Sequence, residues 1–112
     1  MESTRQQKMA RMLLKELGEI LEQEMRGTFH GALITVTKVN VSKDLSIARF
    51  YLSVFGVKDK KATMDNIKAH TSEFRYRLGN RIRKQVRIIP QLEFFEDDSL
   101  DYIENLEKLI NP

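Results

Sequence analysis

The sequence predicts an α+β domain in which helices cover one face of a three-stranded mixed sheet. Three observations support this fold class. Apolar residues recur every three or four positions in several segments, which indicates amphipathic helices. Two alternating apolar stretches joined by a short polar turn indicate an antiparallel hairpin. A later apolar stretch that contains a proline near its start supplies the third strand.

The first element is expected to be a helix that is capped by Ser3 or Thr4 and ends in the region of Gly27. Its apolar residues form one stripe that we expect to lie in the core: Met9, Met12, Leu13, Leu17, Ile20, Leu21 and Met25. The first half of this helix is expected to be partly electropositive, because it carries Arg5, Lys8, Arg11 and Lys15.

The hairpin is expected to consist of strands at 32–42 and 47–55. In the first strand the apolar residues change parity between Val36 and Val39, so a bulge is expected near Thr37 and Lys38. In the second strand one set of alternating residues should be buried: Ala48, Phe50, Leu52 and Val54.

Two helical segments follow, at 60–71 and 72–86, and they are expected to meet at a bend around His70, Thr71 and Ser72, with Ser72 as the second N-cap. The third strand is expected at 88–96, and Ser99 caps an expected C-terminal helix. The order α-β-β-α-α-β plus a C-terminal helix is that of a type II KH domain, an RNA-binding module. Residues 1–112 are therefore interpreted as a single KH-like domain.

Composition argues against an enzyme. The chain has no cysteine, and its two histidines, His30 and His70, lack partners at metal-ligand spacing. The acids at 96–98 are interpreted as a strand end followed by a helix start rather than as a cation site. No phosphate-binding glycine loop or membrane-spanning run occurs, and the N-terminus is too polar for a signal peptide. We expect a cytoplasmic protein without cofactor, metal or membrane partner.

Charge is separated along the chain, although the formal net charge is only +3. Segment 68–87 has a single acid, Glu73, and seven basic residues: Lys68, Arg75, Arg77, Arg81, Arg83, Lys84 and Arg87. Segment 93–107 is acidic and has no base. This pattern favours a nucleic-acid binder whose acids keep the opposite surface off the RNA. The alternative is that the acidic tail folds back and neutralises the basic helix.

The basic helix is the candidate binding site. If its apolar residues Phe74, Leu78 and Ile82 face the sheet, one flank carries Arg77, Arg81 and Lys84, with Arg75 on the other flank and Arg83 pointing outward. Tyr76 could stack on a base or simply cover its neighbours. Gly79 could allow a close approach to RNA or tight packing against another helix.

Two long segments resemble the ribosome-binding factor A family. "VSKDLSIARFYLSVFG" (41–56) is similar to its hairpin signature, and "FRYRLGNRIRKQVRIIPQLEFFEDDSLDY" (74–102) to its second signature. The resemblance implies a type II KH fold without the Gly-x-x-Gly loop. It implies binding to the immature 30S subunit and its 16S rRNA, late rRNA maturation, a link to cold adaptation, and work alongside assembly GTPases.

The chain departs from that family pattern at two places. "RGTFHGA" (26–32) stands where an Asp-Pro-Arg turn is usual, and His70, Thr71 and Ser72 stand where an Ala-x-Gly bend is usual. We expect a residue with a Cβ atom to form this bend at some conformational cost. A monomer is expected. The alternative function is a protein–protein adaptor that docks on a GTPase or ribosomal protein by its acidic C-terminal helix or an exposed strand edge.

Overall fold

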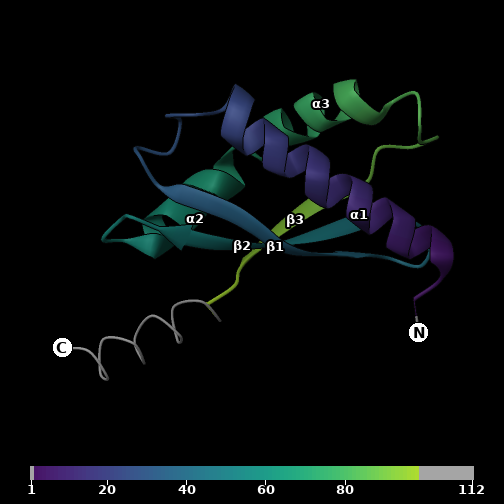
Figure 1. The fold of residues 1–112 in the computed structure, drawn as a ribbon, viewed down its shortest axis with the longest axis horizontal. Helices are drawn as coiled ribbons and strands as arrows, with labels where there is room; N and C mark the ends of the chain where they lie inside the picture. The colour runs from purple at the N-terminus through teal and green to yellow at the C-terminus, as the bar shows by residue number, and fades with distance from the viewer. Residues whose placement is uncertain (1, 99–112) are drawn as a thin grey trace.

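The computed structural model describes residues 2–98, so the helix expected after Ser99 lies outside the described residues. Figure 1 shows the elements: α1 (Thr4–Glu19), η1 (Ile20–Glu24), β1 (Leu33–Val41), β2 (Ile47–Phe55), α2 (Lys60–Ala69), α3 (Thr71–Ile82) and β3 (Gln91–Glu96). Their order confirms the predicted α-β-β-α-α-β core of a KH-like fold. Within residues 2–98, no helix is long and apolar enough to cross a bilayer.

A capping box starts α1. The Ser3 hydroxyl accepts from the N–H of Gln6 (3.2 Å), and the Gln6 side chain accepts from the N–H of Ser3 (2.8 Å). The same glutamine is buried and donates to the carbonyl of Val41 (2.9 Å), which ties the start of α1 to the end of β1. Ser3 is therefore the cap, and the regular α-helix ends at Glu19, where a π-helical turn continues the helix to Glu24.

The sheet has the order β1-β2-β3, with β1 antiparallel and β3 parallel to β2. The predicted bulge is confirmed, because the β1–β2 register shifts between Val36 and Lys38. The third strand begins at Gln91 rather than at residue 88. The carbonyls of Ile89 and Pro90 accept hydrogen bonds from Arg75 and not from a neighbouring strand, so the ladder starts one residue after the proline.

The central helices differ from expectation at two points. Ser72 is not an N-cap, because His70 is the boundary residue of both helices and Thr71 already begins α3. In addition, α3 ends at Ile82 instead of residue 86, since the N–H groups of Gln85 and Val86 both turn back to the Ile82 carbonyl (2.8 and 3.2 Å). Lys84 and Arg87 therefore lie beyond the helix and not along its flank.

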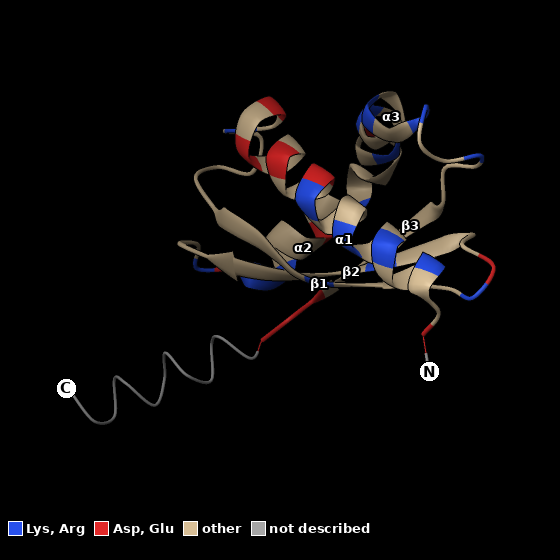
Figure 2. Ribbon diagram, turned by 45° about the vertical axis from the view of Figure 1, so that its right-hand side comes forward, with Lys and Arg blue, Asp and Glu red and all other residues tan. Residues whose placement is uncertain are grey.

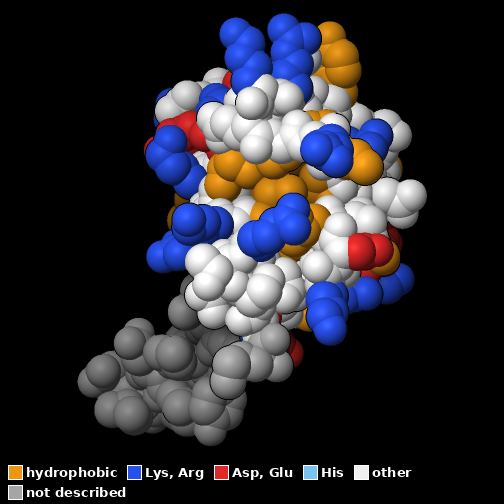
Figure 3. Space-filling view, turned by 90° about the vertical axis from the view of Figure 1, so that its right-hand side faces the viewer, with side chains coloured by type: hydrophobic (Ala, Val, Ile, Leu, Met, Phe, Trp, Pro, Cys, Tyr) orange, Lys and Arg blue, Asp and Glu red, His pale blue; other side chains and the backbone are white. Residues whose placement is uncertain are grey.

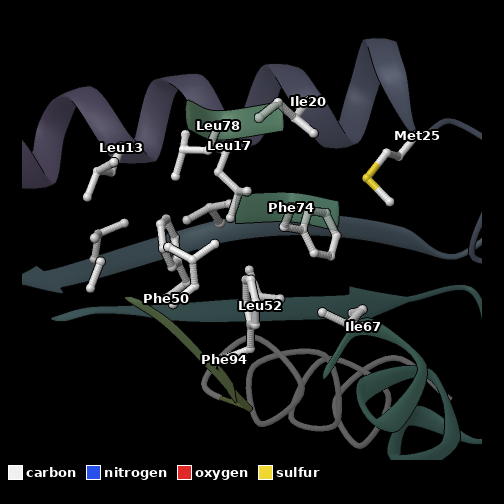
Figure 4. Packing of buried hydrophobic residues seen from close by; sticks show 14 of the residues in the cluster. Leu13, Leu17, Ile20, Met25, Phe50, Leu52, Ile67, Phe74, Leu78 and Phe94 are labelled. Carbon is white, nitrogen blue, oxygen red and sulfur yellow. The ribbon is translucent and has the colours of Figure 1, made fainter. Parts of the chain in front are cut away.

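One hydrophobic core lies between the helices and one face of the sheet (Figure 4). The helix α1 contributes Leu13 and Leu17, α3 contributes Phe74 and Leu78, and the central strand contributes Phe50 among other residues; these five side chains have no exposed surface. Burial of one such large side chain is worth about 1.5–3 kcal/mol. The predicted inward sets of the second strand and of α3 are confirmed: Ala48, Phe50, Leu52, Val54, Phe74, Leu78 and Ile82.

Candidate nucleic-acid interface

Two arginines of α3 that were predicted to face RNA form intramolecular ion pairs. Arg81 binds three carboxylates, those of Glu16 (2.8 Å), Glu19 (2.6 Å) and Glu24 (2.7 Å). Arg77 binds Glu24 (3.1 Å) and, one turn back on its own helix, Glu73 (3.0 Å). We call Glu16, Glu19, Glu24, Arg77 and Arg81 the clamp. It joins the C-terminal half of the first helix to α3.

The π-helical turn explains how Glu24 reaches both arginines. Met25 donates its N–H to the carbonyl of Ile20, five residues back, so η1 takes one more residue per turn than an α-helix. The wider turn brings Glu24, rather than Gln23, to the side that faces α3. Each oxygen of its carboxylate then serves a different arginine: Oε1 accepts from Arg77 and Oε2 from Arg81.

The clamp shifts the pKa values of two of its glutamates and of both its arginines. The hydrogen bond from Arg81 is the main cause that lowers the pKa of Glu24, and Arg77 adds to it. The pKa of Glu19 is also lowered, again chiefly by Arg81. In return, the bond to Glu16, followed by the bond to Glu24, raises the pKa of Arg81. The positive charge of both arginines is thus balanced within the fold.

The acids that neutralise Arg77 and Arg81 were not predicted from the sequence, where the alternative source was the acidic tail. They come chiefly from the first helix and its π-turn, more than fifty residues away in sequence. In the described part of the tail, Glu93 instead binds Arg49 (2.9 Å) and Asp97 accepts from Thr37 (2.6 Å). The signal that could have revealed the clamp is the row of acids in the second half of the first helix.

Arg75 has a structural role in this conformation. Its Nε donates to the carbonyl of Pro90 (3.0 Å) and its Nη2 to that of Ile89 (2.8 Å). These bonds satisfy two carbonyls that precede β3 and fix the path of the chain between α3 and the sheet. The guanidinium nevertheless lines a surface hollow, together with residues of α3.

The remaining predicted cations are exposed: Lys68, Arg83, Lys84 and Arg87. They form no ion pair with any carboxylate of residues 2–98. Tyr76 is 71% exposed and lies beside a hollow of about 410 Å³. The hollow is lined by Ser72, Arg75, Tyr76, Gly79, Asn80, Arg83 and Ile89. A cation, an aromatic ring and hydrogen-bonding side chains thus line one concave surface.

The bend between α2 and α3 needs no glycine. His70 has φ −96° and ψ 14°, outside the left-handed region that favours glycine, so a residue with a Cβ atom can form the bend. Its Nδ1 lies 2.8 Å from the carbonyl of Asn66, and the Thr71 hydroxyl donates to that of Lys68 (2.6 Å). These local bonds give the bend a defined shape.

The two segments that were expected to depart from the family pattern contact each other. Phe29, from the 26–32 loop, is buried and meets the ring of His70 edge-on, with centroids 5.4 Å apart. The same phenylalanine ring stacks on Phe74 of α3 at 6.0 Å. The loop therefore packs against the bend and the start of α3.

Figure 2 shows acids gathered on the second half of the first helix, and basic residues on its first half and on α3. Across the part of the chain that the structure describes, no three His, Asp or Glu side chains are grouped as metal ligands would be.

Comparison with known proteins agrees with this fold. The ribosome-binding factor A of Cytophaga hutchinsonii is 48% identical over 111 residues, which cover 99% of this chain and 84% of that protein. The crystal structure of ribosome-binding factor A from Thermus thermophilus matches with a TM-score of 0.67 at 22% identity, covering 81% of this chain and 94% of that one.

A second Thermus thermophilus structure, a homology model of the factor fitted into a cryo-EM map of a 30S complex, matches with a TM-score of 0.64 at 25% identity and covers 80% of this chain and 91% of that one. The family model for ribosome-binding factor A matches residues 5–110, which is almost the whole sequence. The family match and the relative that is 48% identical agree with the KH-like order of elements and the mixed sheet. The chain belongs to the ribosome-binding factor A family.

Proposed function

We propose that the protein binds the small ribosomal subunit (30S) through phosphates of its 16S rRNA. The observation that carries this proposal is the group of exposed cations after α3, namely Arg83, Lys84 and Arg87, which have no described carboxylate partner. The related Thermus thermophilus factor, which was fitted into a map of a 30S complex, supports the choice of particle. Phosphate contacts of this kind supply affinity and position more than sequence information.

The hollow beside these cations would hold an unpaired nucleotide. Tyr76 offers an exposed ring on which a base can stack, and Arg83 lies at the same hollow for a neighbouring phosphate. Lys68 and the bend at residues 70–72 lie at the N-terminal end of α3, where they extend the contact. Arg77 and Arg81 contribute indirectly in this proposal, because they hold α3 against the first helix.

Membership of the ribosome-binding factor A family extends the proposed function from binding to a biological role. Acting as a monomer in the cytoplasm, the protein would assist late processing of 16S rRNA and maturation of the subunit, with assembly GTPases and during growth in the cold. The exposed cations would let it hold rRNA, as a binding factor does.

Sedimentation of the purified protein with small subunits, large subunits and whole ribosomes tests this function. We expect co-migration with small subunits alone, and a loss of binding between low and moderate salt, because counterions are released when phosphates are contacted. Absence from every particle fraction, or equal association with large subunits, would contradict the proposal.

The adaptor alternative rests on a different surface. A groove of about 810 Å³ runs between the second half of the first helix and the edge strand β1, and Leu33 at its rim is 65% exposed. A partner protein bound there would be held largely by apolar contacts. Binding to small subunits that persists unchanged at moderate salt would favour this groove over the cations.

A further inference from the structure

The first helix carries its charges in two blocks. Arg5, Lys8 and Arg11 occupy its first half and are exposed, without an ion-pair partner among the described carboxylates. The acids of the second half, Glu16 and Glu19, serve the clamp. One half of the helix is thus committed to the fold, and the other half presents unpaired positive charge.

Stability does not account for this arrangement. The N-terminal end of a helix dipole is positive and its C-terminal end is negative, so acids are favourable at the start and bases at the end. This helix has the reverse order, with no acid in its first turn and no base in its last. Like charges three residues apart, such as Arg5, Lys8 and Arg11, also repel one another. A pattern that works against the helix is better explained by a ligand of opposite charge.

The fold places this half-helix near the segment that follows α3. The clamp shows that the two helices run in opposite directions, since Arg77 meets only Glu24 of the first helix while Arg81 also reaches back to Glu16. The chain after Ile82 therefore continues toward the beginning of α1. Figure 3 shows this end of the molecule, where positive side chains surround a hydrophobic area and few negative ones appear.

We propose that the first half of α1 is a second arm of the RNA-binding surface. This inference rests on the proposed function and extends it. The first arm is Arg83, Lys84 and Arg87, and the second arm is Arg5, Lys8 and Arg11, which span about 9 Å of helix. Both arms contact phosphates of the same RNA, whose chain crosses the hydrophobic area between them. The clamp keeps the two arms at a constant separation by holding α3 on the first helix.

The test compares three double variants of the full chain, each of which removes two positive charges. Lys8→Gln/Arg11→Gln weakens the second arm and Lys84→Gln/Arg87→Gln the first. Lys58→Gln/Lys61→Gln is the matched control, because these exposed lysines lie before and at the start of α2. Equilibrium binding to purified small subunits and to a fluorescein-labelled RNA hairpin of about 20 nucleotides is measured from about 50 to about 200 mM salt, the range over which phosphate contacts lose most of their affinity.

We expect each arm variant to reduce the slope of log affinity against log salt by roughly 1.4–1.8, since each lost phosphate contact removes about 0.7–0.9. The control should keep the wild-type slope. The control and Lys84→Gln/Arg87→Gln should keep the wild-type melting temperature, and Lys8→Gln/Arg11→Gln should keep or raise it, because this variant relieves charge repulsion at the positive end of the helix dipole. A wild-type slope for Lys8→Gln/Arg11→Gln, together with a reduced slope for Lys84→Gln/Arg87→Gln, would overturn the second arm and leave the proposed function intact. Salt-insensitive binding by the wild-type protein would overturn both.

Discussion

The two ends of the α1–α3 pair contain the same kinds of basic residue but use them differently. At one end, Arg77 and Arg81 are held by three glutamates of the first helix and its π-turn. At the other end, Arg83 and Lys84 have no such partner among residues 2–98. Helical spacing places Arg81 on a flank of the helix and Arg83 outward, but it does not show what lies opposite that flank. The acids of the neighbouring helix make the difference.

The first way to sharpen this comparison is to ask whether the clamp or the core holds α3. Replacement Leu78→Ala should lower the free energy of unfolding by about 2–5 kcal/mol, because it removes a fully buried side chain and leaves a cavity. Urea unfolding measures the effect, and Leu33→Ala, at a 65% exposed position, is the control. A smaller loss for Leu78→Ala than for Arg81→Gln would mean that the clamp, not the core, anchors the helix.

The second prediction compares the loss of stability on replacing Arg81, at one end, with that on replacing Arg83, at the other. Arg81→Gln leaves three carboxylates without their shared cation, so it should cost about 1–2 kcal/mol of unfolding free energy. Arg83→Gln should leave stability within about 0.5 kcal/mol but reduce the salt dependence of RNA binding. Thermal unfolding and RNA titrations on both variants give the result. Equal stability losses would remove the distinction between the two ends.

The third prediction is that low pH weakens the ion pairs of Glu24 in the clamp. The folded-state pKa of Glu24 lies below its ordinary value of 4.5, mainly because of Arg81. Its stabilising contribution is therefore complete above that pH and is lost as the pH falls through the lowered pKa. Below pH 4.5 the melting temperature of the wild-type protein should fall more steeply than that of Glu24→Gln. Glu22→Gln, on the same π-turn but outside the clamp, should follow the wild type.

The smallest expected effect on stability concerns Gly79. An added Cβ atom would lie 3.5 Å from the side chain of Ile89, an ordinary contact, so no neighbouring helix requires a glycine there. Gly79→Ala should leave unfolding unchanged or raise its free energy by up to about 1 kcal/mol. We expect weaker RNA binding, because Gly79 lines the hollow beside Tyr76. Unchanged binding would show that no RNA approaches this backbone closely.

The 26–32 loop and the bend at His70 were expected to depart from the family pattern, and their unusual residues are visible in the sequence. Their contact is not, because Phe29 and His70 are far apart along the chain and meet only through packing against Phe74. The bend was expected to suit glycine, whereas His70 has a φ of −96°, which lies outside the left-handed region.

The sequence by itself determined the element order, the buried faces and the bulge, because these depend on periodicities of about two and about 3.6 residues that a chain shows locally. It also showed where the cations are. Only the tertiary structure decided which of them remain exposed, since an ion pair depends on distances across the fold. The π-turn carries Glu24, which binds both Arg77 and Arg81 of α3. These two arginines are therefore part of the fold, whereas Arg83, Lys84 and Arg87 remain exposed.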